Sequence, residues 1–324
     1  MQFYKYDDAS VRYTGRFAEH GGAMTATACG STIEIAFCGD LIVMDFDTSN
    51  YENPVPHIYY QLDGGSLFES PIYDHLRIKT TDGGHILKII YKSAVEMQNR
   101  FPLPLVGKIA FLGYTADKSG ILPPDNRKSI EFVGDSITEG VLTDADCEHS
   151  NWDQPSRPHV DDVTSTYAYL TAQHFNLKDL HMGYGAVGVT HGGCGGVPKA
   201  ADAYPYCFSG APVTYPHPDY IVINHGANDK WNGDKELYLK EYENLLTVIR
   251  KAHPNAVIIA LSAFCKVWPE ELKKTIEEFN SKNGDNVVFI DASLWVPAEP
   301  LHPLRTGHKI IAKKLIKELE GIIK

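Results

Sequence analysis

Four loop-like segments of the sequence each follow an apolar stretch and carry a residue of a type that acyl transfer uses. Ser136 lies in FVGDSITEG, Gly188 in MGYGAVGVT, Asn228 in NHGANDKW and His302 in WVPAEPLHPLRTGH. A serine hydroxyl becomes a strong nucleophile when an imidazole accepts its proton, so Ser136 and His302 are the candidate nucleophile and base. Fixed N–H donors must then stabilise the charge on the carbonyl oxygen. The candidate donors of this oxyanion hole are the Ser136 and Gly188 backbone amides and the Asn228 side chain.

Gly183, Gly185 and Gly188 also match the G-x-G-x-x-G spacing of a dinucleotide-binding turn. Such a turn opens a helix directly and is followed about 20 residues on by an acidic residue at the end of the next strand. The chain continues instead as VTHGGCGGVPKAADAYPY, which is too rich in glycine and proline to begin a helix, and the next acid, Asp202, lies within this loop. We therefore expect an oxyanion loop here, and a reaction that needs no cofactor.

Two tryptophans, Trp231 and Trp295, lie near the segments that hold Asn228 and His302. An aromatic ring offers an apolar face to a sugar, so both are candidate substrate-binding residues. Each is equally consistent with packing in the core.

Two pairs of residues have the spacing of half a metal site, His191 with Cys194 and Cys147 with His149. A zinc site needs further ligands, and neither pair has a third and a fourth nearby in the sequence. We interpret both pairs as incidental and expect a mechanism without a metal ion.

From residue 129 onward, apolar strands alternate with helices. This alternation indicates a parallel sheet covered on both faces, and in such sheets the active site lies at the carboxyl ends of the strands. The expected strands are SIEFVGDS, KDLHMGYG, DYIVINHGAND, AVIIALSA and NVVFIDAS. The expected helices are STYAYLTAQHF, residues 234–253, residues 269–283 and a last helix from Thr306.

The helix predicted over residues 234–253 starts at Asp234, a residue type that caps helices well. It carries Leu237, Leu245, Leu246 and Ile249 on or near one face. We expect this face to pack against the sheet.

The first third of the chain has the pattern of short strands. In TIEIAF the alternation places Ile33, Ile35 and Phe37 on one face, and Asp-Gly-Gly turns separate later strands. Many short strands with close turns indicate a β-sandwich. We predict a jelly-roll-like sandwich over residues 1–125, ending near KSGILPPDNRK, and a hydrolase domain over residues 126–324.

The second part resembles the GDSL/SGNH hydrolase superfamily in the order of its motif blocks. FVGDSITEG matches the first block, residues 226–229 match the G-x-N-D of the third, and EPLHPLRTGH matches the last, while Gly188 aligns with the glycine of the second. The resemblance spans residues 130–308. It implies an SGNH-type α/β/α domain with a flavodoxin-like, five-stranded parallel sheet.

The first part resembles the β-sandwich that precedes the hydrolase domain in the second family of carbohydrate esterases. The segments that carry this resemblance are RYTGRF at 12–17, STIEIAFCG at 31–39, GGHILKIIYKSAVE at 83–96 and GKIAFLGY at 107–114. The resemblance implies a serine esterase that removes O-acetyl groups from plant-type oligo- or polysaccharides, of the xylan or mannan type.

The chain departs from the superfamily pattern at the acid three residues before the histidine. The family has Asp there, and this sequence has Glu299, followed by Pro300. Either Glu299 orients His302 in a Ser-His-Glu triad, which we expect, or a backbone carbonyl orients the imidazole and Ser136–His302 works as a dyad.

Composition excludes some partners. The net charge is −11 with a pI near 5.7, and the sequence has no Lys/Arg cluster of the kind that nucleic acid requires. No stretch has the apolar length of a membrane span, and MQFYKYDDAS lacks the features of a signal peptide. We expect a cytoplasmic esterase that acts on imported acetylated oligosaccharides.

Two other functions stay open. The same site could hydrolyse lipid or thioester acyl groups, or the chain could be a carbohydrate-binding protein whose catalytic site has decayed. The sequence leaves the oligomeric state open.

Overall fold

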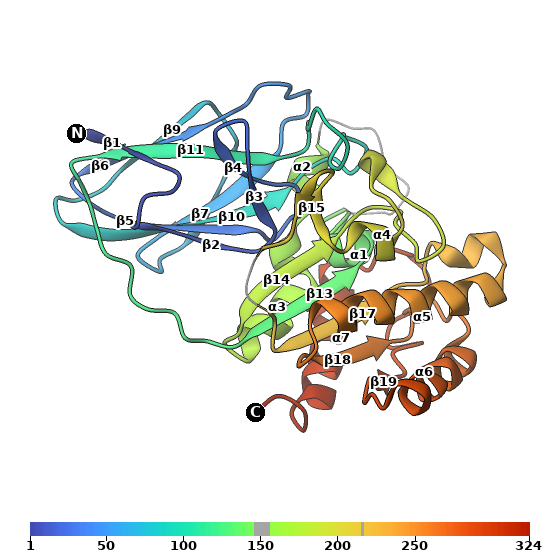
Figure 1. Ribbon diagram of the computed structural model, residues 1–324. Coiled ribbons are helices and arrows are strands. Elements are labelled where there is room, and N and C mark those ends of the chain that lie inside the picture. Colours follow the sequence, from blue (N-terminus) through green and yellow to red (C-terminus); the bar gives the residue numbers. More distant parts are fainter. Residues whose placement is uncertain (146–155, 215–216) are drawn as a thin grey trace.

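The computed structural model describes residues 1–145, 156–214 and 217–324. It contains an antiparallel β-sandwich and an α/β part built on a parallel sheet, which confirms the predicted fold class (Figure 1). The blue strands of the sandwich lie at the upper left of Figure 1, and the orange and red helices of the α/β part lie at the lower right. None of the described helices combines the length and the apolar composition that a membrane crossing needs.

Two six-stranded antiparallel sheets form the sandwich. One has the order β3-β4-β11-β6-β9, with β1 paired to β11, and the other has the order β12-β5-β10-β7-β8, with β2 paired to β5. Ile33, Ile35 and Phe37 of β5 are fully buried in the apolar core, as their alternation predicts. The strands are β1 (Gln2–Lys5), β2 (Val11–Thr14), β3 (Phe17–His20), β4 (Ala23–Ala26), β5 (Thr32–Cys38), β6 (Leu41–Phe46), β7 (His57–Leu62), β8 (Leu67–Pro71), β9 (His75–Lys79), β10 (Gly84–Ser93), β11 (Ile109–Ala116) and β12 (Lys118–Ser119).

A five-stranded parallel sheet of order β14-β13-β17-β18-β19 forms the centre of the α/β part. Its strands are β13 (Ser129–Gly134), β14 (Lys178–Gly183), β17 (Tyr220–Asn224), β18 (Val257–Leu261) and β19 (Val288–Ile290). The helices are α1 (Ser136–Glu139), α2 (Arg157–Val160), α3 (Tyr167–His174), α4 (Ala200–Ala203), α5 (Lys235–Ala252), α6 (Pro269–Asn283) and α7 (Arg305–Leu319). A small hairpin, β15 (Tyr206–Phe208) and β16 (Ala211–Pro212), and the 3₁₀ turns η2 (Val163–Ser165), η3 (Cys194–Gly196) and η4 (Asp229–Asn232) complete it.

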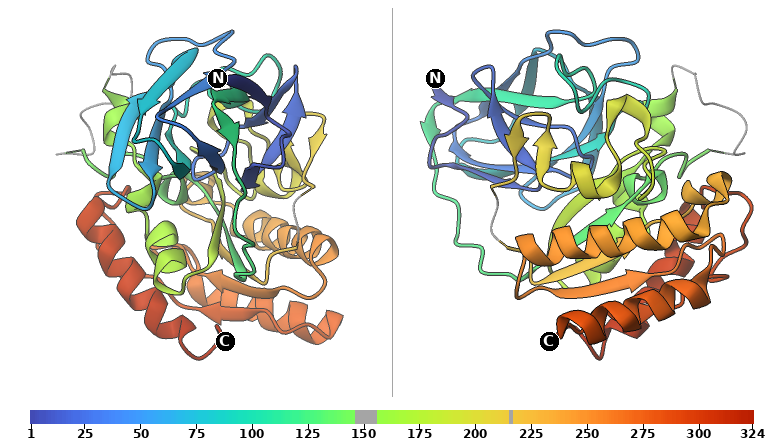
Figure 2. Two further views of the ribbon diagram at one scale, coloured as in Figure 1. Left: turned by 90° about the vertical axis from the view of Figure 1, so that its left-hand side faces the viewer. Right: turned by 45° about the vertical axis from the view of Figure 1, so that its right-hand side comes forward.

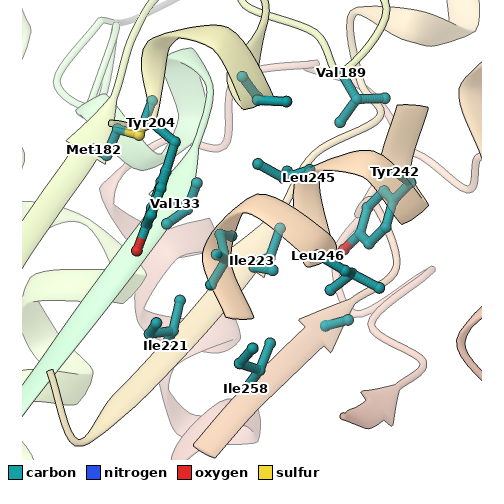
Figure 3. Packing of buried hydrophobic residues seen from close by; sticks show 14 of the residues in the cluster. Val133, Met182, Val189, Tyr204, Ile221, Ile223, Tyr242, Leu245, Leu246 and Ile258 are labelled. Atoms are coloured by element: carbon teal, nitrogen blue, oxygen red, sulfur yellow. The ribbon is translucent and has the colours of Figure 1, made fainter. Parts of the chain in front are cut away.

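Helices cover both faces of the parallel sheet. Val133 of β13 belongs to the apolar cluster of α5 and α6, whereas its neighbour Phe132 belongs to the cluster of α3 and α7. Figure 3 shows the first cluster, in which Leu245 and Leu246 of α5 gather with the sheet residue Ile223. The two views of Figure 2 show the orange and red helices lying around the sheet and away from the sandwich.

Helix α5 begins as predicted and differs at one predicted core position. The Oδ1 atom of Asp234 accepts the Leu237 N–H at 2.9 Å, so Asp234 is the N-cap. Leu245 and Leu246 are buried as expected, but Leu237 is exposed. The reason is that the next residue, Tyr238, takes the buried position of this turn, where its ring packs 5.4 Å from that of Trp268.

The parallel strands end level with one another. Gly134 of β13 pairs with Gly183 of β14 on one side and with Asn224 of β17 on the other. Asn224 pairs in turn with Leu261 of β18, and Leu261 pairs with Ile290 of β19. The loops that follow these strands therefore emerge at one edge of the sheet, where the sequence predicts the active site.

A buried ion pair joins the sandwich to the parallel sheet. Arg16, immediately before β3, donates to Oε1 of Glu131 on β13 from Nε at 3.2 Å and from Nη2 at 2.9 Å. The Tyr204 hydroxyl donates to the other carboxylate oxygen at 2.6 Å. Both charged side chains are fully buried, and removing one partner of such a pair leaves an uncompensated charge. The two parts are therefore fitted to each other by charge as well as by apolar contact.

The connection between the two parts is short. The last sandwich strand ends at Ser119 and β13 begins at Ser129, so the division that we predict at residue 125 falls in the connection.

Candidate active site

Ser136 is placed by the sharp turn between β13 and α1. The carboxylate of Asp135 caps α1 by accepting the Ile137 N–H at 3.0 Å. Gly140 ends the helix with φ +94°, and a side chain there would collide with the backbone of Asp162. Burial raises the pKa of Asp135 to about 7. The turn thus presents the serine at the first position of a helix, at the carboxyl end of a central strand.

His302 reaches this serine from the segment before α7. Its Nε2 atom lies 2.8 Å from Ser136 Oγ, and both residues are buried, with 3% and 6% of their surface exposed. Burial, and then the positive charge of Arg157, lower the pKa of His302 to about 4. The imidazole is therefore neutral at pH 7 and can accept a proton from the hydroxyl.

The side-chain amide of Asn228 connects, by hydrogen bonds, the loops that follow three neighbouring strands. Its Nδ2 atom donates to the Val187 carbonyl at 3.1 Å and, more weakly, to Asp135 Oδ2 at 3.4 Å. Asn228 follows β17, Val187 follows β14 and Asp135 follows β13, so this amide bridges neighbouring strand ends. The structure brings Asn228 to the Ser136 turn, as the sequence predicts.

Gly188 lies in the same loop cluster, but its backbone N–H donates to the His191 carbonyl at 3.1 Å. Glycine is required at this position for a steric reason, because the Cβ atom of any other residue would lie only 2.7 Å from the Asp229 carboxylate. That carboxylate accepts the backbone N–H groups of Val189 and Thr190 at 3.1 and 2.9 Å. The predicted donor role of Gly188 is not available in this arrangement. By contrast, no hydrogen bond among the described residues uses the N–H of Ser136.

The glycine pattern itself does not open a helix. After β14 the chain passes through a loop to the short turn η3 and then to the four-residue helix α4. This path matches the expectation of a glycine-rich loop and lacks the helix that would bind a pyrophosphate.

Glu299 does not reach His302. Its side chain is exposed, and among the described residues it makes no hydrogen bond and no ion pair. Its charge is also absent from the influences on the His302 pKa. The triad that we expected with Glu299 is therefore not assembled in this structure, because the loop before His302 turns the longer acidic side chain outward.

The two candidate tryptophans differ. Trp231, in η4 and three residues after Asn228, has 72% of its surface exposed. Trp295 is partly buried and packs against the apolar cluster of α3 and α7. Its backbone carbonyl accepts a hydrogen bond from the Lys314 ammonium at 3.1 Å. The structure thus leaves the indole of Trp231 open to a ligand and uses Trp295 in packing.

Sequence reasoning missed a group of buried charges behind the serine. Arg100, on the sandwich segment between β10 and β11, donates from Nη1 and Nη2 to the two carboxylate oxygens of Glu139 in α1. Both side chains are buried, with 0% and 3% exposed. The helix that carries Ser136 is therefore held by a bidentate ion pair from the other part of the chain.

A second buried arginine extends this group. Arg157 of α2 contacts Asp161 Oδ2 at 2.9 Å and Glu96 Oε1 at 3.4 Å. Burial raises the pKa of Glu96 to about 7 and that of Asp161 to about 6. No local sequence motif predicts these ion pairs. Glu96, and also Arg16 of the ion pair with Glu131, do lie in segments that carry the resemblance of the sandwich, GGHILKIIYKSAVE and RYTGRF.

The two cysteine–histidine pairs gain no support as metal ligands. Cys147 and His149 lie outside the described residues. The Nδ1 atom of His191 lies 2.8 Å from the Gly192 carbonyl, and neither His191 nor Cys194 belongs to a three-ligand group within the described ranges.

An open groove of about 710 Å³ lies apart from Ser136, Asn228 and His302. It runs between β3 and the β15–β16 hairpin and is lined by residues that include His20, Met24 and Phe208. The contact between the Ser136 hydroxyl and the His302 imidazole, and not this groove, therefore marks the candidate active site.

Comparison with known proteins agrees with this geometry. The GDSL-like lipase/acylhydrolase family matches residues 132–310. The cellulase/esterase CelE of Acetivibrio thermocellus is 27% identical over 97% of this chain, and the chain spans about 40% of the length of that relative.

Solved structures share the fold over the whole chain. A family two carbohydrate esterase from Clostridium thermocellum, in complex with cellohexaose, has a TM-score of 0.75 at 23% identity, covering 96% of this chain and 98% of that one. The acetyl xylan esterase Est2A from the rumen bacterium Butyrivibrio proteoclasticus has a TM-score of 0.78 at 19% identity, covering 99% of each chain. Because the family match covers more than half of the sequence and includes the segments of Ser136, Asn228 and His302, the chain belongs to the GDSL-like lipase/acylhydrolase family.

Proposed function

We propose that this protein is a serine esterase that removes O-acetyl groups from carbohydrates of the xylan or mannan type. The observation that carries the proposal is the 2.8 Å contact between Ser136 Oγ and a neutral His302 Nε2. The names of the similar proteins, a cellulase/esterase, a carbohydrate esterase and an acetyl xylan esterase, support a sugar ester as the substrate.

The reaction proceeds through an acyl-enzyme. Ser136 Oγ attacks the ester carbonyl carbon while its proton passes to His302 Nε2, and a tetrahedral intermediate forms. The bond from that carbon to the sugar oxygen then breaks, and the imidazolium returns the proton to this oxygen, which releases a sugar hydroxyl. A water molecule then attacks the acetyl carbon as it gives a proton to His302 Nε2. The imidazolium returns this proton to Ser136 Oγ as the bond from Oγ to the acetyl carbon breaks and acetate leaves.

The negative carbonyl oxygen needs donors during both steps. The Ser136 N–H is the first donor that we assign, because no described residue accepts it. The second is the Asn228 Nδ2 proton that makes only the 3.4 Å contact with Asp135. Gly188 contributes by letting Asp229 hold the neighbouring loop rather than by its own N–H.

We assign the nucleophile to Ser136 and the general base to His302. The Glu299 side chain is exposed and makes no hydrogen bond or ion pair with the imidazole, so the proposal gives Glu299 no part in the proton transfer. Trp231 is the candidate platform for a sugar ring because its indole is exposed close to Asn228.

The proposal is tested by hydrolysis of an aryl acetate. The wild type should hydrolyse it, Ser136→Ala should lose at least about 10³-fold of the rate, and Ser66→Ala, an exposed serine of the sandwich, should match the wild type. Equal rates in wild type and Ser136→Ala would overturn the esterase assignment and favour a carbohydrate-binding protein.

The substrate class is tested next. Acetate release from acetylated xylan or mannan oligosaccharides should exceed release of longer acyl chains from aryl esters. Preference for long acyl chains would instead identify a lipid or thioester hydrolase with the same site.

A further inference from the structure

Three side chains from separate elements converge at the junction of the sandwich and α2. His57 begins β7, Glu69 lies on the paired strand β8, and His159 lies on α2. The Nδ1 atoms of the two histidines approach one carboxylate oxygen, Glu69 Oε1, at 2.6 and 3.3 Å. Their rings meet edge to face with centroids 4.5 Å apart. The three ligand atoms all lie within 4.8 Å of one another.

This set of atoms has the chemistry of a divalent transition-metal site. Two imidazole nitrogens and one carboxylate suit Zn²⁺ and its neighbours in the first row. Ligand atoms that bind one tetrahedral zinc at about 2.0–2.1 Å lie roughly 3.3 Å apart. The distance from His159 to Glu69 already has this value, and the shorter distance from His57 is a hydrogen bond that widens when the metal replaces the proton.

The burial of the three ligands differs in a way that leaves access. The side chains of His57, Glu69 and His159 are 5%, 29% and 63% exposed. The exposed side of the group leaves the fourth position to water.

One positive charge lies beside the group and limits the affinity. The buried ammonium of Lys92 lies 3.2 Å from Glu69 Oε1, and it also donates to the carbonyls of Pro158, His159 and Asp161. Lys92 therefore binds the end of α2 and also shares Glu69 Oε1 with the two histidines. Since Lys92 already balances the Glu69 charge, we expect weaker binding than at a closed structural zinc site.

We propose that His57, Glu69 and His159 bind one divalent transition-metal ion, with Zn²⁺ as the reference ion, and that this ion ties α2 to the sandwich. The ion takes no part in ester hydrolysis, because its ligands are not those of the Ser136–His302 site. Its effect is on the junction, where α2 also carries Arg157 and its contact with Glu96.

The test uses the full chain after treatment with EDTA. Titration with Zn²⁺ in a calorimeter should show one bound equivalent, and saturating Zn²⁺ should raise the Tm by several degrees, because a ligand of the folded state stabilises it. His159→Ala and Glu69→Gln should each weaken binding at least tenfold and remove most of the Tm rise. The exposed position of His159 makes its variant a mild one for folding.

His75→Ala is the matched control. His75 pairs with Asp45 at 2.6 Å on the sandwich surface without a second histidine, so its variant should bind Zn²⁺ like the wild type. Replacement of Zn²⁺ by Co²⁺ should give the visible absorption of a four-coordinate site in the wild type and not in His159→Ala.

Two results would overturn the proposal. One is no saturable Zn²⁺ binding by the wild type, which would make the group a hydrogen-bonded histidine pair on a carboxylate. The other is equal binding by the wild type, His159→Ala and Glu69→Gln, which would place the ion elsewhere on the chain.

Discussion

His302 combines a direct contact with the Ser136 hydroxyl and a pKa lowered to about 4, mainly by burial. A base must be unprotonated to accept the serine proton, so the low pKa of His302 should extend the activity to acidic pH. We predict that kcat/KM keeps its plateau below the usual histidine value of about 6.5 and falls as the pH approaches 4. A pH–rate profile of aryl acetate hydrolysis measures this. A half-maximal point at pH 6.5 or above would show that the imidazole is more hydrated, or more strongly paired, than the structure indicates.

Glu299 provides the second prediction at the residue scale. Its exposed side chain makes no contact with His302, so Glu299→Gln should lower kcat by less than about tenfold, or about 1.4 kcal/mol of barrier. Kinetics of this variant beside Glu318→Gln, which changes an exposed glutamate on α7, checks the value. A loss of several orders of magnitude in Glu299→Gln alone would restore the triad that we first expected.

At the scale of elements, α1 depends on a charge supplied by the sandwich. Arg100 holds Glu139 by a bidentate pair, and removal of one partner of a buried pair costs about 3–5 kcal/mol. Arg100→Ala should therefore lower the free energy of unfolding by about that amount and reduce kcat, because α1 positions Ser136. Denaturant unfolding and kinetics measure both effects.

A double variant separates charge from volume at this pair. Arg100→Met with Glu139→Gln removes both charges, so it should regain part of the stability that Arg100→Ala loses. If Arg100→Ala unfolds at the same denaturant concentration as the wild type, the pair does not secure α1.

At the scale of the whole molecule, the buried junction makes stability depend on pH. Burial raises the pKa of Glu96 to about 7. A carboxyl with a raised pKa binds its proton more tightly in the folded state, so its contribution to stability is present at low pH and declines as the pH rises from about 4.5 to 7. The groups that act on Glu96 are Glu139, Arg157, Asp161 and Arg100.

We therefore predict that Glu96→Gln, a neutral mimic of the protonated acid, changes the Tm little at pH 5 and raises it by several degrees relative to the wild type at pH 8. Thermal unfolding of both proteins at the two pH values measures the difference. A difference that stays the same or becomes negative at pH 8 would mean that the ionised Glu96 is well paired with Arg157.

Much of the fold could be predicted from the sequence because its signals are local. The strand pattern of Ile33, Ile35 and Phe37, the Asp234 cap and the helix over residues 269–283 depend on neighbours a few positions away. The contact of Ser136 with His302 was also predictable, since level strand ends bring both segments to one edge of the sheet.

The tertiary structure alone decided which groups meet across the junction and how loop atoms are used. Arg16 meets Glu131 across 115 positions and Arg100 meets Glu139 across 39, from parts of the chain that fold on different sheets. From the sequence, Glu299 and Gly188 could be expected near the site. The outward orientation of the Glu299 side chain and the hydrogen bond of the Gly188 N–H depend on the tertiary conformation of their loops. The physical reason is that periodicity and capping act within an element, whereas the partner of a buried charge or a loop amide is set only when elements pack together.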